Sequence, residues 1–207
     1  MTEGPGGDNG QSYQQLCLPG ATLHYWPDWL SANEAQRYFD QLQYQLNWQQ
    51  PQLRLYGRAV PIPRRQVWMG DPHCSYRYSG VLFEPEPWHP LVLELTNRLN
   101  QHLGLGFNAV LLNWYSSGEQ HMGWHADDEP ELGDAPQIAS LSLGEARWFE
   151  LRHQSQLMQF KLMLQHGSLL LMGGECQRYW QHRVAKMAKA QQGRINLTFR
   201  KMIKTAK

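Results

Sequence analysis

Three side chains in the sequence could bind one metal ion together. His125 and Asp127 are two positions apart, and His182 follows much later in the chain. On an extended strand, residues two positions apart leave the same face, so His125 and Asp127 can chelate a single ion. Two imidazoles and one carboxylate are the protein ligands of a non-haem Fe(II) oxygenase site, and they leave positions open for oxygen and a co-substrate. The chain has nine histidines, so an ordinary surface H-x-D is the alternative.

The segment from Arg194 to Arg200 alternates between polar and apolar residues. Its polar members are Arg194, Asn196, Thr198 and Arg200. In a strand this alternation places all four on one face. Two arginines on a sheet face need an anion, and a dicarboxylate suits them because each guanidinium can bind a carboxylate through two hydrogen bonds. A solvent-facing strand is the alternative.

Asn113-Trp114-Tyr115 similarly puts an amide and a phenol on one strand face, ahead of the metal motif. Both side chains could bind a ligand there, or they could cap a buried polar network.

Strand-like segments surround these residues. Short stretches of alternating or branched residues, cut by Gly, Pro and Asp, predict strands. We expect them at about 108–115, 137–143, 146–153, 160–164, 168–172 and 193–202.

Two helices are expected before the strands. Ser31-Ala32-Asn33-Glu34 has the form of a capping box and predicts a helix at about 31–47. Pro90 suits a first turn and Gly104 a stop, which predicts a second helix at about 88–103. Two helices and at least six strands without β-α-β alternation favour an α+β fold, a helix-backed antiparallel sandwich or jelly roll.

Composition is typical of one domain. The chain has 207 residues and 24.1 kDa, enough to bury a sizeable core. Residues 1–20 are expected to form a flexible tail and 21–207 a single domain. No apolar run is long enough to span a membrane, and the start lacks the pattern of a secretory signal, so an intracellular location is expected. The three cysteines, Cys17, Cys74 and Cys176, suggest neither disulfides nor a zinc site.

Charges are segregated along the chain although the net charge is only +1. Residues 41–70 and 176–207 contain Lys and Arg but no acid, whereas the acids gather around 119–150. Two basic stretches flanking an acidic, metal-capable segment would suit a polyanion such as a nucleic acid. Two solvated faces of a neutral protein explain the pattern equally well.

The combined motifs resemble one known family. The order Asn113-x-Tyr115, His125-x-Asp127, His182, Arg194-x-Asn196-x-Thr198-x-Arg200 is similar to that of the AlkB family of Fe(II)/2-oxoglutarate-dependent dioxygenases. The runs 113–128, 138–140, 166–170 and 194–201 look like the DNA-repair homologues that carry a finger before the catalytic core. The resemblance covers about residues 50–204.

The resemblance implies a double-stranded β-helix, with a dioxygenase core at 105–204 and a nucleotide-recognition segment that contains a hairpin at 50–85. It implies that His125, Asp127 and His182 bind Fe(II). The residues implied to bind 2-oxoglutarate are Asn113, Tyr115, Arg194, Asn196, Thr198 and Arg200. With O2, such enzymes convert 2-oxoglutarate to succinate and CO2, and they oxidise an N-methyl group that is lost as formaldehyde.

The recognition segment contains candidate DNA contacts. Leu55-Tyr56-Gly57-Arg58 resembles the family's finger, with Tyr56 at the intercalating position, where other members more often carry Phe. A side chain that fills the gap left by a flipped base lowers the cost of extrusion. Arg58, Arg64 and Arg65 are expected to contact phosphates. An ordinary hairpin aromatic is the alternative for Tyr56.

Further candidates would contact the base itself. Tyr76-Arg77-Tyr78 resembles the family's pocket aromatics, with Tyr78 placed to stack on the base. Asp128 and Glu129 could accept from an exocyclic amine or favour a cationic methylated base; a solvated acidic turn is the alternative.

The resemblance therefore implies a DNA repair dioxygenase that reverses base alkylation directly. Expected substrates are 1-methyladenine and 3-methylcytosine, with etheno adducts as a further candidate, in duplex and also single-stranded DNA. Two alternatives stay open: an RNA demethylase or protein hydroxylase with the same chemistry, and a catalytically silent nucleic-acid-binding jelly roll. A monomer is expected, cytoplasmic in a bacterium or nuclear in a eukaryote.

Overall fold

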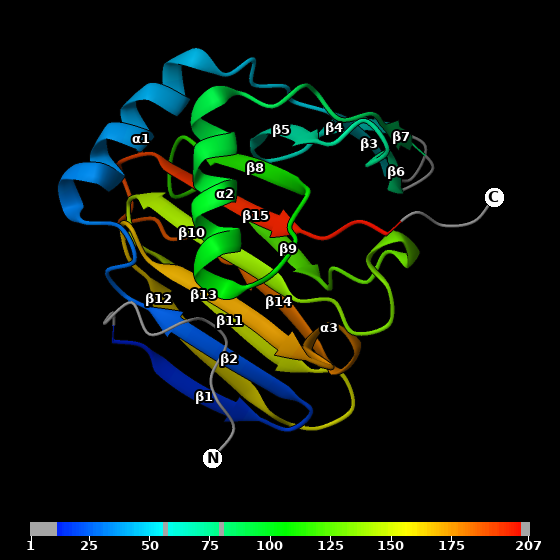
Figure 1. Cartoon of the computed structure of the whole chain (residues 1–207). Coiled ribbons are helices and arrows are strands. Elements are labelled where there is room, and N and C mark those ends of the chain that lie inside the picture. Colours follow the sequence, from blue (N-terminus) through cyan, green and yellow to red (C-terminus); the bar gives the residue numbers. More distant parts are fainter. Residues whose placement is uncertain (1–11, 56–57, 79–80, 204–207) are drawn as a thin grey trace.

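Two antiparallel sheets face each other and enclose an apolar interior (Figure 1). The structure is a computed structural model that describes residues 12–55, 58–78 and 81–203. The interior between the sheets contains Leu111 and Met172 from the large sheet and Leu151 and Val184 from the small sheet. This arrangement is the jelly roll that the strand pattern and the family resemblance predicted.

The large sheet has seven strands. In spatial order they are β1 (Gln14–Leu18), β2 (Ala21–Trp26), β13 (Leu169–Gly174), β10 (Ile138–Gly144), β15 (Arg194–Arg200), β8 (Ala109–Tyr115) and β5 (Arg65–Gly70). β15 lies between β10 and β8 and pairs with both strands along its length. All seven of its residues are buried, which excludes a solvent-facing strand.

The small sheet has four strands. They are β12 (Gln159–Leu164), β11 (Arg147–His153), β14 (Trp180–Val184) and β9 (Met122–His125). A four-residue helix, α3 (Cys176–Tyr179), leads into β14, and a 3-10 turn, η1 (Pro130–Leu132), follows β9. The expected strands at 137–143, 146–153, 160–164 and 168–172 correspond to β10, β11, β12 and β13.

Two long helices cover the outer face of the large sheet (Figure 1). α1 (Ala32–Gln45) begins at the expected capping box, where Glu34 accepts from Ser31 and its backbone amide donates to the Ser31 hydroxyl. α2 (Pro90–Leu103) begins with Pro90 and ends at Gly104, which has a φ of 65°. Apolar residues of both helices pack on the odd-numbered residues of β15, and this fixes which face of β15 turns inward.

Several elements were not predicted. β1 and β2 precede α1, and β5 lies between the helices. One hairpin was expected within 50–85, and this segment contains two, β3 (Gln52–Leu55) with β4 (Arg58–Pro61) and β6 (Tyr76–Tyr78) with β7 (Val81–Phe83). The expected tail at 1–20 is wrong for 14–18, because β1 pairs with β2 and packs Leu16 against the intersheet core. Within the described part of the chain, no helix is long and apolar enough to cross a membrane.

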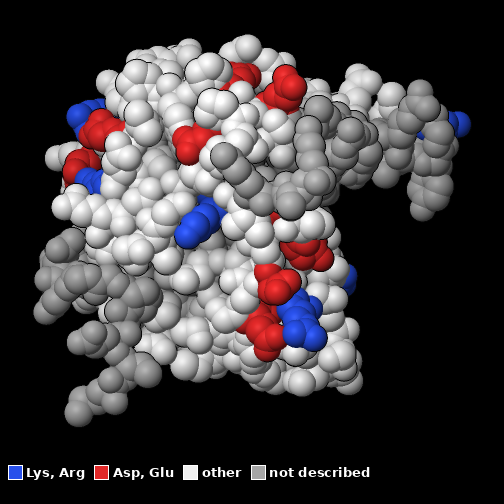
Figure 2. All heavy atoms as spheres, turned by 45° about the vertical axis from the view of Figure 1, so that its right-hand side comes forward, with Lys and Arg blue, Asp and Glu red and all other residues white. Residues whose placement is uncertain are grey.

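Pairing between distant segments offsets part of the charge segregation. Arg183 and Lys186 of the basic C-terminal stretch contact Glu150 and Glu119 at 2.6 and 3.3 Å. Arg178 pairs locally with Glu175 at 2.9 Å. On the face drawn in Figure 2, Lys and Arg side chains lie near Asp and Glu side chains instead of forming one basic stripe. On this face, a polyanion would therefore meet individual cations and no continuous basic stripe.

Candidate metal and co-substrate site

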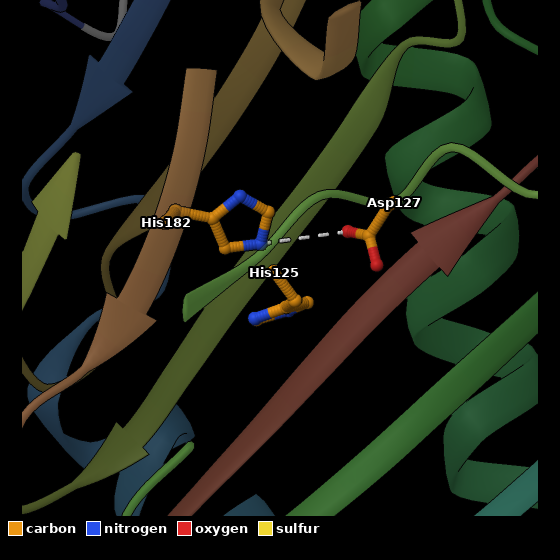
Figure 3. Close-up of side chains that lie close together, drawn as sticks. All are labelled: His125, Asp127 and His182. Carbon is orange, nitrogen blue, oxygen red and sulfur yellow. Dashed lines mark ion pairs between the residues drawn. The ribbon is translucent and has the colours of Figure 1, made fainter. Parts of the chain in front are cut away.

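The three expected metal ligands converge between the sheets. β9 and β14 pair so that His125 lies opposite His182, and Asp127 follows in the segment after β9. One ligand atom from each residue lies within 4.8 Å of the others, and His182 Nε2 is 3.7 Å from Asp127 Oδ2 (Figure 3). Histidine and carboxylate ligands in this arrangement suit a divalent transition metal with open positions.

Both imidazoles are in the form that binds metals. His125 Nδ1 lies 2.9 Å from the carbonyl oxygen of Gly123. A donated N–H there leaves Nε2 as the lone-pair nitrogen for a metal, the usual role of a backbone carbonyl beside a metal-binding histidine. Burial lowers the pKa of His125, and burial lowers that of His182 to about 3. Neutral rings at physiological pH do not have to lose a proton before binding an ion.

Asp127 is held as a carboxylate by its neighbours. Arg200 Nη2 donates to Asp127 Oδ1 at 2.5 Å. Burial alone would raise the pKa of Asp127, but the charge and hydrogen bond of Arg200 together with His182 and His125 outweigh it, and the pKa is lowered to about 2. The backbone N–H of Asp127 donates to Gln177 Oε1 at 2.9 Å. Asp127 is therefore ionised before any metal binds, and it is held in place by the hydrogen bonds of its carboxylate and of its backbone N–H.

Five of the six residues expected to bind 2-oxoglutarate lie next to the expected metal ligands. A cavity between the sheets is lined by His125, Asp127 and His182 together with Asn113, Tyr115, Asn196, Thr198 and Arg200. Thr198 donates to Asn196 Oδ1 at 3.2 Å, and the Asn196 amide donates to the Ser140 hydroxyl at 2.8 Å. The structure thus brings the metal motif, β8 and β15 to one place, as the sequence predicted.

Arg194 supplies a test of whether an anion belongs here. Its side chain is 1% exposed and Nη2 donates to the Ser142 hydroxyl at 2.9 Å. Nε and Nη1 have no hydrogen-bond partner among the described residues. Burial lowers its pKa to about 10, so the group stays charged at neutral pH. A buried cation whose N–H groups lack acceptors is stabilised by an anion, and a carboxylate of 2-oxoglutarate fits this requirement.

The predicted phosphate contacts divide into two kinds. Arg58 on β4 and Arg65 on β5 are exposed, and Arg65 lies over the Trp114 ring at 5.2 Å. Arg64 is instead buried, and its Nε donates to Asn113 Oδ1 at 2.8 Å. The expectation of a phosphate contact does not hold for Arg64 in this structure, because its guanidinium orients a residue of the co-substrate cavity.

Residues expected to contact the base are described to different extents. Tyr56 and Gly57 lie outside the described residues. Tyr76, Arg77 and Tyr78 form β6, whose backbone alone is described.

Of the two acids that follow the metal motif, Asp128 is exposed. Glu129 is half-buried, and burial raises its pKa.

Two buried residues of this region were missed in the sequence. Gln177 positions Asp127, and Arg147 at the start of β11 donates to backbone carbonyls around the site. Phe149 and Leu151 are buried and alternate with less buried neighbours on β11, so the period of two already pointed Arg147 inward. Gln177 lies in a four-residue helix that has no sequence pattern of its own.

Comparison with known proteins agrees with this site. The family described as 2OG-Fe(II) oxygenase superfamily matches residues 22–200. "Alpha-ketoglutarate-dependent dioxygenase alkB homolog 3" of Bos taurus is 39% identical over 184 residues, which cover 84% of this chain and 64% of that protein. "DNA oxidative demethylase ALKBH2" of Arabidopsis thaliana is 34% identical over 226 residues, covering 96% of this chain and 72% of that protein.

The fold is also found among solved structures. "The structure of OsALKBH1" superposes with a TM-score of 0.61 at 19% identity, and covers 92% of this chain and all of that one. This likeness shows the fold, while the relatives of higher identity show the family. The chain spans 64% of the length of the bovine alkB homolog 3. Together with its His-Asp-His cluster, these matches show that the chain belongs to the AlkB family of the 2OG-Fe(II) oxygenase superfamily.

Proposed function

We propose that this protein is a DNA repair dioxygenase that oxidatively demethylates alkylated bases by direct reversal. The observation that carries the proposal is that the three expected metal ligands line one intersheet cavity with Tyr115, and that the buried, partly unpaired Arg194 lies beside the Tyr115 ring. Relatives named as DNA oxidative demethylases, at 34–37% identity, support DNA as the substrate. The proposed substrates are 1-methyladenine and 3-methylcytosine, and etheno adducts are a further candidate.

The side chains of the site have separable tasks in this proposal. Bound Fe(II) and 2-oxoglutarate would supply the oxidation of the N-methyl carbon, with succinate, CO2 and formaldehyde as products. His125, Asp127 and His182 would hold the metal, and Arg200 keeps Asp127 ionised. Arg194 would bind a carboxylate of the co-substrate, beside Tyr115. The packed sheets limit access of water to this interior.

Recognition of DNA is assigned to residues 50–85 and to the segment after β9. Arg58 and Arg65 are exposed and available to phosphates. Tyr56 is the proposed intercalating residue, and Tyr76, Arg77 and Tyr78 would line the base pocket. A methylated base of this type is cationic, so the carboxylate of Asp128 and the half-buried Glu129 are proposed to favour it over a normal base.

Turnover on defined oligonucleotides tests the proposal. Fe(II)-loaded protein is expected to release succinate and formaldehyde in equal amounts with 1-methyladenine or 3-methylcytosine in DNA. Neither product should form with unmethylated DNA or with a His125→Ala variant. Absence of turnover by fully metal-loaded protein that binds 2-oxoglutarate would refute it. That result would leave the RNA demethylase, the protein hydroxylase and the silent nucleic-acid-binding jelly roll as the remaining assignments.

Strand preference needs a separate assay. A side-by-side comparison on duplex DNA, single-stranded DNA, methylated single-stranded RNA and a lysine-rich peptide distinguishes the DNA enzyme from an RNA demethylase or a protein hydroxylase. Tyr56→Ala is expected to reduce activity on duplex DNA more than on single strands, because only a duplex leaves a gap to fill. Equal losses would contradict the finger assignment. We further propose an intracellular monomer.

A further inference from the structure

Arg147 is a buried cation that none of the proposed roles uses. Arg147 is the first residue of β11 and is 1% exposed. It donates to four backbone carbonyl oxygens, those of Ser117 at 3.3 Å, Gly118 at 3.4 Å, Gln120 at 2.8 Å and Ala185 at 2.7 Å. Among the described residues no carboxylate lies within ion-pair distance of it. Its Nε has no hydrogen-bond partner among the described residues, and the carbonyl dipoles at Nη1 and Nη2 bring no net negative charge to balance the guanidinium.

The four carbonyls belong to the segments that connect the site's strands. Ser117, Gly118 and Gln120 lie between β8, which carries Tyr115, and β9, which carries His125. Ala185 follows β14, which carries His182. One guanidinium therefore joins the ends of three strands that bear site residues.

The same guanidinium also lies beside the co-substrate end of the cavity. The guanidinium carbons of Arg147 and Arg194 are 5.8 and 5.5 Å from the centroid of the Tyr115 ring. Tyr115 is itself 1% exposed. Neither arginine has a carboxylate partner among the described residues, so two positive charges flank one phenol in a dry interior. Unpaired buried charge is unfavourable and is relieved by an anion.

The two ends of the cavity differ in charge. Arg200 faces Asp127 and is compensated by that carboxylate. Arg194 is six residues away on the same strand, at the Tyr115 end, where no carboxylate of the described residues lies within ion-pair distance of Arg194 or Arg147. A ligand with a single carboxylate can satisfy one end only, whereas a dicarboxylate also brings a negative charge to the Tyr115 end.

We propose that Arg147 is a positioning residue that makes the Tyr115 end of the cavity selective for a co-substrate with a second carboxylate. It acts through Tyr115 and the tied connecting segments and through its charge, without touching the co-substrate. The inference rests on the proposed 2-oxoglutarate site. In this inference, a residue outside that site sets the preference of the cavity for dicarboxylates over monocarboxylates.

Anaerobic binding measures this preference without turnover. The Fe(II)-loaded protein is titrated calorimetrically with 2-oxoglutarate and with 2-oxopentanoate, which has the same chain length but lacks the second carboxylate. Wild-type protein is expected to prefer 2-oxoglutarate. Arg147→Met, which removes the charge, should reduce the ratio of the two affinities by about tenfold, as the loss of one nearby buried charge predicts. Arg147→Lys, which keeps the charge, should retain the ratio while both affinities fall.

A stability-matched control separates selectivity from general loosening. Leu42 is fully buried in α1 on the far side of the large sheet, so Leu42→Ala destabilises the fold away from the cavity. It should leave the affinity ratio unchanged. If Arg147→Met does not melt cooperatively, Arg147→Gln takes its place, because it is also neutral but keeps donors for the carbonyls.

The possible results separate the role of Arg147 from the proposed co-substrate site itself. A folded neutral variant with the wild-type affinity ratio overturns the role of Arg147 and leaves the proposed co-substrate site intact. Wild-type protein that shows no preference for 2-oxoglutarate overturns both. A ratio that falls in the neutral variant and persists in Arg147→Lys and Leu42→Ala supports the inference.

Discussion

Arg200 donates from Nη2 to Oδ1 of Asp127, an expected metal ligand, at 2.5 Å, and both side chains are almost fully buried. The pair joins the last strand of the large sheet to the segment that follows β9 of the small sheet. It thereby connects the residues of the co-substrate cavity to the metal ligands.

Arg200→Met is expected to lower the free energy of unfolding of the metal-free protein by about 3–5 kcal/mol, because it leaves the Asp127 carboxylate buried without its cation. Urea denaturation measures the change. Arg183→Met is the matched control, since Arg183 pairs with Glu150 at 2.6 Å on a half-exposed face. A surface pair of this kind contributes about 0–1 kcal/mol. Equal losses in the two variants would contradict a special role for the buried pair.

Metal binding should stabilise the folded protein. The three ligand atoms converge only in the folded state, so an ion at about 100 times its dissociation constant adds about 2.7 kcal/mol to the free energy of unfolding. Thermal melts with Fe(II) under anaerobic conditions, or with Mn(II), are expected to shift upward, and a chelator should reverse the shift. His125→Ala should abolish the shift. His121→Ala, four residues earlier and outside the ligand cluster, should preserve it, and its loss there would count against the assignment.

Gln177 is expected to affect metal affinity through Asp127. Gln177→Leu removes the acceptor for the Asp127 backbone N–H, and loss of such a supporting contact typically weakens metal binding about 10–100-fold. Competition titration against a chromogenic chelator gives the affinity. Gln181→Leu makes the same chemical change on β14, where Gln181 accepts from Arg152 away from the ligands. Similar affinities in the two variants would show that Gln177 does not position Asp127.

Acid should destabilise the protein partly through His24 and His102. Burial lowers the pKa of both below the ordinary histidine value of 6.5, and Arg98 further lowers that of His102. Above pH 6.5 both rings are neutral in the folded and unfolded chains. As the pH falls below 6.5, the unfolded chain takes up protons first, so the free energy of unfolding decreases.

Urea denaturation at pH 7.5 and pH 5 measures this loss. His102→Gln should lose less stability over the interval than wild type does, because the metal ligands titrate in both proteins while residue 102 no longer titrates. The exposed His73, replaced by Gln in the same way, is the control. A pH dependence of His102→Gln that matches wild type would refute the assignment to His102.

Local sequence patterns predicted the elements that are determined by a single local signal, such as a helix cap or the alternation of a strand. The capping box at Ser31 and the Pro90 and Gly104 signals located α1 and α2 to within about three residues. The alternation of β15 correctly placed its polar residues on one face, because helices bury the opposite face. β5 and β14 were missed, since Arg65–Gly70 and Trp180–Val184 are buried through pairing with distant strands and carry no isolated pattern.

The sequence predicted the site residues whose side-chain chemistry is specific. It did not predict orientations that depend on how the strands pack. His125, Asp127 and His182 are recognisable by type and spacing, and the structure brings them together. Arg64 and Arg65 look equivalent in sequence, yet only Arg65 is exposed, because Arg64 turns inward to Asn113. That difference follows from the register of β5 against β8, which no local pattern encodes.

Glycine at position 118 is expected to be needed where two connecting segments touch. A Cβ at Gly118 would lie 1.9 Å from the carbonyl oxygen of Met187 and 2.7 Å from that of Ala190. The backbone N–H groups of Gly118 and Met187 donate to Ala190 and Gly118 at 2.9 Å each, so neither segment can move without breaking these bonds. Gly118→Ala should therefore lower the free energy of unfolding by about 1–3 kcal/mol, the usual cost of overpacking.

The same substitution should weaken metal and 2-oxoglutarate binding, because these segments continue into β9 and follow β14, which carry His125 and His182. Gly123→Ala is the matched control. A Cβ there meets nothing within 4 Å, and the carbonyl oxygen that contacts His125 Nδ1 belongs to the backbone and is retained. Urea denaturation and anaerobic titration of both variants make the comparison. If Gly118→Ala and Gly123→Ala unfold and bind alike, the close contact between the two segments is not required for the site.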